Sequence, residues 1–415
     1  MKMNIYMFFL SILLFFGCAN DKDIQENNKQ TINNIKEQVE DSTFNIITGA
    51  EQTEEYLPLL ENKKIAVVAN HTSLIKNTHL IDSLLKKGIA ITKIFCPEHG
   101  FRGNADAGET INSSVDSITG LPIISLYGNH KKPYPEDMAE IDVVIFDIQD
   151  VGARFYTYIS TMHYVMEACA ENDKELIILD RPNPNGYYVD GPVLDTAFKS
   201  FIGMHPVPVV HGMTVGEFAK MINGEGWLGK NKQCKLTVIT CKNYNHSMQY
   251  DLPVKPSPNL PNARAVYLYP SLCFFEGTTL SIGRGTDMQF QVIGHPDLKN
   301  IAEADFFFTP HSNEGAKNPK FKDVTCYGYD LRKESEIFKD KHGQLNLEYI
   351  LHLYKIFPDK KNFFKNTNSF DLIAGTNELK QQIIEGKSEE EIRNSWQVKL
   401  NEFKTIRKKY LLYDD

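Results

Sequence analysis

Six short runs of apolar residues constrain the fold of this chain more than any other feature. They span residues 64–70, 91–96, 122–128, 141–148, 175–180 and 235–241. The runs are rich in β-branched residues and do not alternate with polar ones, which is the pattern of strands buried on both faces. Helical patterns lie between several of them, for example at 157–172 and 214–222. Strands that alternate with helices predict a doubly wound α/β domain around a parallel sheet.

Proline spacing and helix-start signals divide the chain further. Four prolines between residues 250 and 265 interrupt any regular element, so we place a domain boundary there, between 43–258 and 259–415. The second domain is smaller and is predicted to be mixed α+β. Thr214 is expected to cap one helix, and Ser388 with Glu391 forms a capping box ahead of another helix.

The first 42 residues have the composition of a targeting segment and a tether. Residues 1–18 combine an early Lys with an apolar run that ends at Gly17-Cys18, which resembles a lipoprotein signal peptide and its lipidated Cys. The alternative is ordinary secretion with a chance Cys. Residues 19–42 are polar and lack aromatics, which predicts a disordered tether. We therefore expect a protein anchored to a membrane through Cys18, outside the cytoplasm, on the periplasmic side or the cell surface.

Charge and cysteine content exclude several functional classes. The net charge of −8, without Lys/Arg runs, argues against nucleic acid as a partner. The six cysteines after Cys18 form no C-x-x-C motif and are predicted to be buried free thiols. The glycines at 224, 226 and 229 have dinucleotide-binding spacing but follow a helix, whereas that fingerprint must follow a strand. We expect no cofactor.

Polar residues follow several of the predicted strands. Parallel sheets bind ligands at the carboxyl ends of their strands, so these residues are expected to gather on one active-site rim. They are Asn70, Glu98, His99, Asp147, Asp150, Asp180 and Arg181. No histidine spacing supports a metal site there.

The motif PEHGFRG, at 97–103, has the most unusual local chemistry. Glu98, between Phe95 and Phe101, could serve as a proton donor, and Arg102 could clamp an anionic group of a substrate. The alternative is a buried Glu98–Arg102 pair that stabilises a loop. The residues alone favour neither interpretation.

Two further segments carry carboxylates, guanidinium groups and aromatic rings suited to sugar recognition. In FDIQDVGARFYTYIS, at 146–160, the alternative interpretation makes Asp150 a helix cap and the tyrosines part of the core. The glycine-rich loop at 274–287 could close over the rim. For Asp180 and Arg181, a structural pair is as plausible as a substrate contact.

The order of these motifs resembles one family. The sequence reads VVANHTS, FCPEHGFRGNADAG, TGLPIISLYG, DVVIFDIQDVGARFYTYIS, LDRPNPNG, HGMTVGE, PSPNLP and YPSLCFFEGTTLSIGRGT in turn. It resembles the exo-acting β-N-acetylmuramidases, which are peptidoglycan glycosidases. The resemblance implies a Rossmann-like domain and a smaller C-terminal domain around a cleft, without a nucleotide cofactor. It also implies release of terminal N-acetylmuramic acid from peptidoglycan fragments. One departure is Gln289–Phe290, where the family is expected to have Pro-Phe.

The resemblance makes Glu98 the leading catalytic carboxylate, as the general acid. The second catalytic group stays open among Asp147, Asp150, Glu276, Asp287 and the substrate's own acetamido group. A lactyl carboxylate would give Arg102, Arg154 or Arg284 a function. The residues expected to bind substrate are Asn70, His99, Arg102, Arg154, Tyr156, Asp180, Arg181, Glu276, Arg284 and Asp287. The rival hypotheses are a non-catalytic muropeptide-binding lipoprotein and a metal-dependent hydrolase.

Overall fold

The structure is a computed structural model, and it describes four stretches of the chain: residues 45–101, 114–229, 232–333 and 343–415. Residues 47–415 form one compact unit. The predicted signal peptide, the tether, Cys18 and Arg102 lie outside the described residues. No described helix is both long enough and apolar enough to cross a membrane.

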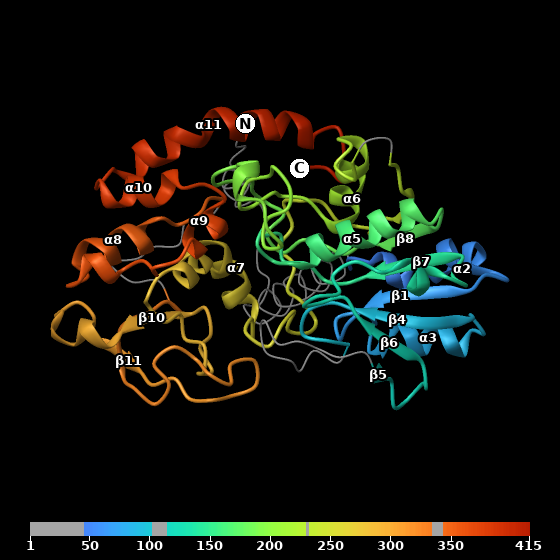
Figure 1. Cartoon of the computed structure of the whole chain (residues 1–415), viewed down its shortest axis with the longest axis horizontal. Coiled ribbons are helices and arrows are strands. Elements are labelled where there is room, and N and C mark those ends of the chain that lie inside the picture. Colours follow the sequence, from blue (N-terminus) through green and yellow to red (C-terminus); the bar gives the residue numbers. More distant parts are fainter. Residues whose placement is uncertain (1–44, 102–113, 230–231, 334–342) are drawn as a thin grey trace, which may run out of the picture. The chain divides into compact units, whose positions relative to one another are not determined.

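A seven-stranded sheet forms the centre of the N-terminal half (Figure 1). Its order is β5 (Ser114–Val115), β6 (Pro122–Ser125), β4 (Ile91–Cys96), β1 (Ile65–Ala69), β7 (Val143–Asp147), β8 (Glu175–Leu179) and β9 (Lys235–Ile239). All neighbours pair in parallel except the edge strand β5, which is antiparallel to β6. Each of the six apolar runs contains one parallel strand, so the predicted doubly wound α/β fold is confirmed.

Helices cover both faces of this sheet. In β1, Ile65 and Val67 belong to a core formed with α2 (Thr53–Leu60) and α3 (Leu80–Lys86). Ala66 and Val68 point the other way, into the core with α5 (Tyr158–Glu171) and α6 (Val215–Gly224). Because successive strand residues face opposite cores, both must be apolar, which explains the continuous apolar runs.

Short elements complete the N-terminal half. They are η2 (Gly49–Glu51), β2 (Leu74–Ile75), β3 (Thr78–His79), α4 (Pro135–Met138) and η3 (Thr196–Phe198). The predicted helix at 214–222 corresponds to α6. Thr214 accepts from the Glu217 backbone N–H, which confirms the predicted cap, and the Glu217 carboxylate accepts from the Thr214 backbone N–H, which completes a capping box.

The C-terminal region combines helices with a small antiparallel sheet. The sheet order is β10 (Val292–His295), β12 (Cys326–Asp330) and β11 (Phe306–Phe308). The helical elements are α7 (Ala263–Leu272), η4 (Cys273–Gly277), η5 (Pro296–Asn300), α8 (Glu348–Ile356), η6 (Lys360–Asn362), α9 (Ser369–Ala374), α10 (Glu378–Ile384) and α11 (Glu389–Arg407). The capping box of Ser388 and Glu391 opens α11, as predicted. Mixed α+β structure in this smaller region is thereby confirmed.

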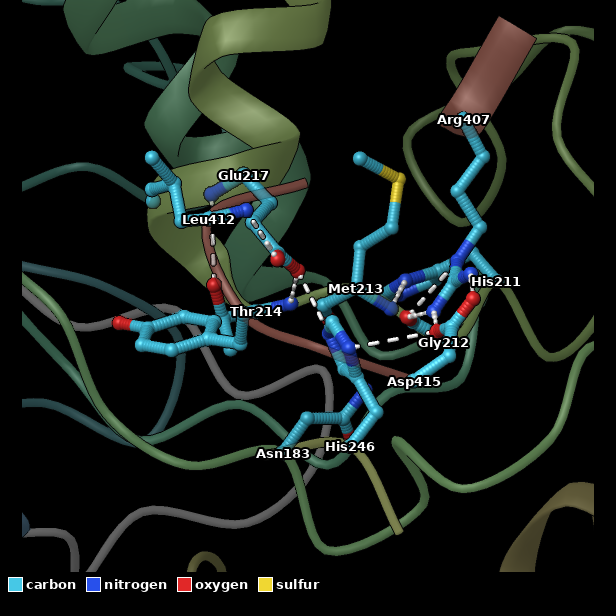
Figure 2. Close-up of polar contacts among 12 residues, drawn as sticks. Asn183, His211, Gly212, Met213, Thr214, Glu217, His246, Arg407, Leu412 and Asp415 are labelled. Carbon is cyan, nitrogen blue, oxygen red and sulfur yellow. Dashed lines mark hydrogen bonds and ion pairs between the residues drawn. The ribbon is translucent and has the colours of Figure 1, made fainter. Parts of the chain in front are cut away.

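The last residues of the chain return to α6 and complete a buried polar network (Figure 2). The Leu412 backbone N–H donates to the Glu217 carboxylate at 2.8 Å, and His246 Nε2 lies 2.9 Å from the same carboxylate. Asp415 lies 3.4 Å from His246 Nδ1 and also pairs with Arg407 at 2.7 Å. Glu217 and His246 are almost fully buried, so this segment supplies hydrogen-bond and ionic partners to groups that water cannot reach.

All six described cysteines are buried and free, as the sequence predicts. They are Cys96, Cys169, Cys234, Cys241, Cys273 and Cys326.

Candidate active site

The strand order reverses between β1 and β7, and polar residues follow both strands at this point. Strands β4 and β6 lie on one side of β1, whereas β7, β8 and β9 lie on the other. Such a reversal opens a crevice at the carboxyl ends of the strands. Asn70 follows β1 here and is fully buried, and its Oδ1 accepts from the backbone and hydroxyl of Thr72 at 2.9 and 2.6 Å.

Glu98 lies two residues beyond the end of β4, in a tight turn. His99 has a φ of 69° and Gly100 a φ of 75°, so the backbone enters the left-handed region immediately after Glu98. A histidine there is strained, and such strain is concentrated at functional sites. The Thr157 hydroxyl, just before α5, donates to Glu98 Oε2 at 2.8 Å. The turn and this hydrogen bond together fix where the Glu98 carboxylate points.

The negative charge of Glu98 contributes to raised pKa values of two tyrosines. Burial first, and then the Glu98 carboxylate, raise the pKa of Tyr127 above its ordinary value. The same two causes lead the upward shift in the pKa of Tyr158. Both phenols therefore stay protonated at physiological pH and can donate hydrogen bonds near the carboxylate.

A cavity of about 190 Å³ collects the leading candidates. Its lining includes Glu98, His99, Tyr156, Thr157, Glu276 and Arg284. Residues that follow strands of the N-terminal sheet and residues of the 274–287 segment therefore line one site. Tyr156 donates its hydroxyl to the Pro256 carbonyl at 2.9 Å, and its ring lies edge-on to those of Tyr158 and Tyr269.

Glu276 and Arg284 form an ion pair in the lining. Arg284 Nε donates to Glu276 Oε1 at 2.7 Å, and the guanidinium group lies over the Phe290 ring, 5.2 Å from its centroid. Burial alone would raise the pKa of Glu276, but the positive charges of Arg284 and Lys320 outweigh it and lower that pKa to about 2. Glu276 is therefore ionised throughout the physiological pH range.

The glycines around Arg284 permit this geometry. Gly283 and Gly285 have φ values of 77° and 82°, and an added Cβ would lie 2.6 Å from the Met288 carbonyl oxygen or 2.5 Å from a Pro319 side-chain carbon. Neither position tolerates a side chain, which explains the glycine-rich loop.

Asp147 and Arg181 pair with each other away from the cavity lining. Arg181 donates from Nε and Nη2 to the two carboxylate oxygens of Asp147, at 2.6 and 3.0 Å, and both side chains are buried. A second donation from Arg181 Nη2 reaches the Leu74 carbonyl at 2.9 Å. This fork-to-fork geometry uses both groups to tie β7 to the turn after β8.

Asp180 is also held by internal partners. It accepts from the hydroxyls of Thr214 and Tyr413, both at 2.7 Å, and from the Gly216 backbone at 2.8 Å. Burial raises the pKa of Asp180 to about 6, although these hydrogen bonds oppose the shift. The residue anchors α6 and the C-terminal segment to the end of β8.

Arg154 and Asp150 are buried and do not belong to the cavity lining. Arg154 is buried, donates to the carbonyls of Pro192, Val207, Ile373 and Ala374 at 2.7 to 3.0 Å, and has its pKa lowered by burial to about 9. Asp150 Oδ2 accepts from the Gly152 backbone at 2.7 Å, and burial raises the Asp150 pKa to about 7. Asp287 is exposed and does not belong to the cavity lining.

Thr157 and two lysines near Glu276 were not among the predicted site residues. Thr157 lies between Tyr156 and Tyr158, in a segment that the sequence analysis did identify. Its hydrogen bond to Glu98 could not be predicted, because Glu98 is distant in the sequence. Lys320 and Lys365 carry no local motif. Among the described residues, no three His, Cys, Asp or Glu side chains are grouped to hold a metal ion.

Comparisons with known proteins agree along nearly the whole chain. Residues 65–264 match the family model described as exo-β-N-acetylmuramidase NamZ, N-terminal, and residues 267–413 match its C-terminal counterpart. The peptidoglycan β-N-acetylmuramidase NamZ of Bacillus subtilis is 36% identical over 430 residues, covering 100% of both chains.

Two crystal structures of DUF1343 family proteins from Bacteroides fragilis are also similar. One is 48% identical with a TM-score of 0.81, and the other is 30% identical with a TM-score of 0.77. Each similarity covers 89% of this chain and 99% of the other.

Proposed function

The chain belongs to the NamZ family of exo-β-N-acetylmuramidases, which are glycoside hydrolases, and on that premise we propose a specific reaction. The protein hydrolyses the terminal β-glycosidic bond of peptidoglycan fragments and releases N-acetylmuramic acid from their non-reducing ends. The observation that carries the proposal is the cavity in which Glu98 and Glu276, from distant parts of the chain, come together beside aromatic rings.

Glu98 acts as the general acid in this proposal. Its proton passes to the glycosidic oxygen as the bond from that oxygen to the anomeric carbon breaks. Water supplies the hydroxyl group that the anomeric carbon gains, and the water's remaining proton restores the protonated carboxyl. The hydrogen bond from Thr157 supports this assignment, because a proton donor must hold one orientation toward the leaving oxygen.

Glu276 is the best-supported second carboxylate. It lines the same cavity, and its lowered pKa keeps it negatively charged when positive charge develops on the sugar ring. In this role it stabilises the oxocarbenium-like transition state or orients the acetamido group of the substrate. Asp147 and Asp150 are less suited, because Asp147 is paired with Arg181 and neither residue lines the cavity.

Aromatic rings give the cavity its affinity for a sugar. Tyr156, Tyr158, Tyr269 and Phe290 all contribute to the lining. Flat rings pack against the C–H surfaces of a pyranose, while its hydroxyl groups need carboxylates and amides as partners. Asn259 and Ser257 supply neutral polar groups in the same wall.

Release of a chromophore from a β-linked N-acetylmuramic acid glycoside tests the proposal, with the N-acetylglucosamine analogue beside it. Wild type should release it only from the muramic acid compound. Glu98→Gln should lose about a hundredfold to ten-thousandfold in kcat. Glu61→Gln is the matched control, because Glu61 is exposed and lies outside the cavity lining.

Two outcomes would favour the rival functions. Saturable binding of the sugar by a folded wild type without turnover would point to a muropeptide-binding protein. Loss of turnover with a chelator, and recovery with a divalent ion, would point to a metal-dependent hydrolase. Turnover that survives Glu98→Gln would remove Glu98 from the mechanism.

We also propose that the protein is anchored through a lipid on Cys18 and acts in the cell envelope. The signal-peptide pattern and the polar tether support this localisation. Incorporation of a labelled fatty acid by wild type, and its loss in Cys18→Ser, is the expected result. Equal labelling of both forms, or of neither, would contradict the anchor.

A further inference from the structure

A second pocket, of about 390 Å³, adjoins the cavity through the ion pair of Glu276 and Arg284, which line both. Its cationic lining side chains are Arg284, Lys317, Lys320 and Lys365, whereas Glu276 is the one carboxylate in that lining. We call this the lysine pocket. Its excess of positive charge suits an anion.

Lys320 is already committed to the fold. Its ammonium group donates to the carbonyls of Phe275, Thr278 and Leu280 at 3.1, 2.9 and 2.8 Å. These bonds hold η4 and the strand-like segment after it. Lys320 therefore contributes positive potential to the lysine pocket, but its three donors are used.

Lys365 is fixed by its backbone and presents its side chain to the pocket. Its backbone N–H donates to the Gly277 carbonyl at 3.0 Å, and Phe364 bridges Thr278 in antiparallel fashion. Its ammonium group makes no hydrogen bond or ion pair with any described residue, yet it acts electrostatically on Glu276 and Lys320. The backbone of Lys365 is therefore held in place while its ammonium group is available to bind an anionic ligand.

Arg284 also has donors to spare. Only its Nε is engaged, with Glu276, so within the described part of the chain its two Nη groups have no hydrogen-bond acceptor. A carboxylate at the border of the two pockets could accept from Arg284 Nη and from Lys365 Nζ. Charge-assisted bonds of this kind are the strong ones.

We propose that the lysine pocket binds the lactyl carboxylate of the substrate, with Lys365 as a specificity-determining residue. This inference rests on the proposed function, which seats the sugar ring in the neighbouring cavity. N-acetylmuramic acid differs from N-acetylglucosamine by this lactyl ether. A pocket that gains an ion pair only from the first sugar discriminates against the second, because the second supplies no anion to the partly exposed Lys365.

The test compares wild type, Lys365→Gln and Lys365→Arg, with Lys361→Gln as the matched control because Lys361 is exposed and outside the pocket. Kinetics use the chromogenic muramic acid glycoside. Lys365→Gln should raise KM about tenfold or more with kcat little changed, since one charge-assisted bond is lost. Lys365→Arg should restore most of the loss. The control should match wild type.

Binding measurements separate this inference from the proposed function. Calorimetry in a Glu98→Gln background uses N-acetylmuramic acid, its uncharged methyl ester and N-acetylglucosamine. Lys365→Gln should weaken the binding of N-acetylmuramic acid to the affinity measured for its methyl ester. The affinities for the methyl ester and for N-acetylglucosamine should not change. Equal affinity of the acid for both forms would overturn the lysine pocket while leaving the glycosidase intact. No turnover and no binding of any sugar by wild type would instead defeat the proposed function.

Discussion

The hydroxyl of Thr157 lies 2.8 Å from Oε2 of Glu98, and it joins the residue before α5 to the turn after β4. Both residues line the cavity. Thr157 precedes the helix without using its side chain as a cap, so the hydroxyl is available to the carboxylate. This contact offers a way to perturb the geometry of Glu98 without removing the group itself.

Thr157→Val should lower kcat about tenfold with little change in KM, because the isosteric change removes the bond that orients Glu98. Helix α5 should be unaffected. Thr157→Ser keeps the hydroxyl and should retain most activity. Initial rates on the muramic acid glycoside check both. Equal kcat values for Thr157→Val and wild type would show that the hydrogen bond from Thr157 does not position Glu98.

Arg181→Met should destabilise the fold by about 3–5 kcal/mol, since it leaves the buried Asp147 carboxylate without its partner. The double variant Asp147→Asn/Arg181→Met should recover part of the loss. Urea unfolding followed by circular dichroism measures both. A single variant as stable as wild type would mean that Asp147 reaches another cation or becomes protonated at no cost.

Asp150 should make stability fall as pH rises from about 4 to about 7. Burial raises its folded pKa to about 7, whereas the unfolded value is near 3.8. Within this window the native state holds a proton that the unfolded state has lost, so raising the pH favours unfolding. Asp150→Asn removes this dependence and keeps an acceptor for Gly152. The free energy of unfolding of the variant, minus that of wild type, should therefore increase between pH 5 and pH 8 in urea titrations. If this difference does not change with pH, Asp150 does not have the raised pKa assigned to it.

Tyr413→Phe should destabilise the protein by about 1–3 kcal/mol, because its hydroxyl donates to buried Asp180 and accepts from the Cys241 backbone. Catalytic rates of the folded variant should be unchanged, since Tyr413 lies outside the cavity lining. Tyr410→Phe is the control, because its hydroxyl contacts the partly exposed Glu225 and its loss should cost less. Thermal unfolding of wild type, Tyr413→Phe and Tyr410→Phe measures these differences. Equal unfolding midpoints would show that the Tyr413 hydroxyl does not stabilise the fold.

The parallel sheet was predictable because its strands face two cores. Residues such as Ile65 and Ala66 must both be apolar, and that requirement leaves a direct trace in the sequence. The helix starts at Thr214 and Ser388 were also predictable from the sequence, because a capping box is a contact between residues three positions apart.

The candidate site was only partly predictable, for an equally physical reason. A charged residue at a strand end looks the same in sequence whether it faces a cavity or a buried partner. Asp147 and Arg154 resemble Glu98 in this respect, yet their charges are taken up by Arg181 and by four carbonyls. Lys365 shows the converse, because nothing near it in the sequence indicates that it faces Glu276.

The network around Glu217 also imposes an order in time. Leu412 follows Glu217 by 195 residues, and Tyr413 follows Asp180 by 233, so the ribosome makes both buried carboxylates long before these two partners exist. The buried polar contacts of Glu217 and Asp180 are complete only once the final segment is present. A peptide spanning α11 and the tail, added in trans to a truncated chain, is accordingly expected to complete the fold by fragment complementation.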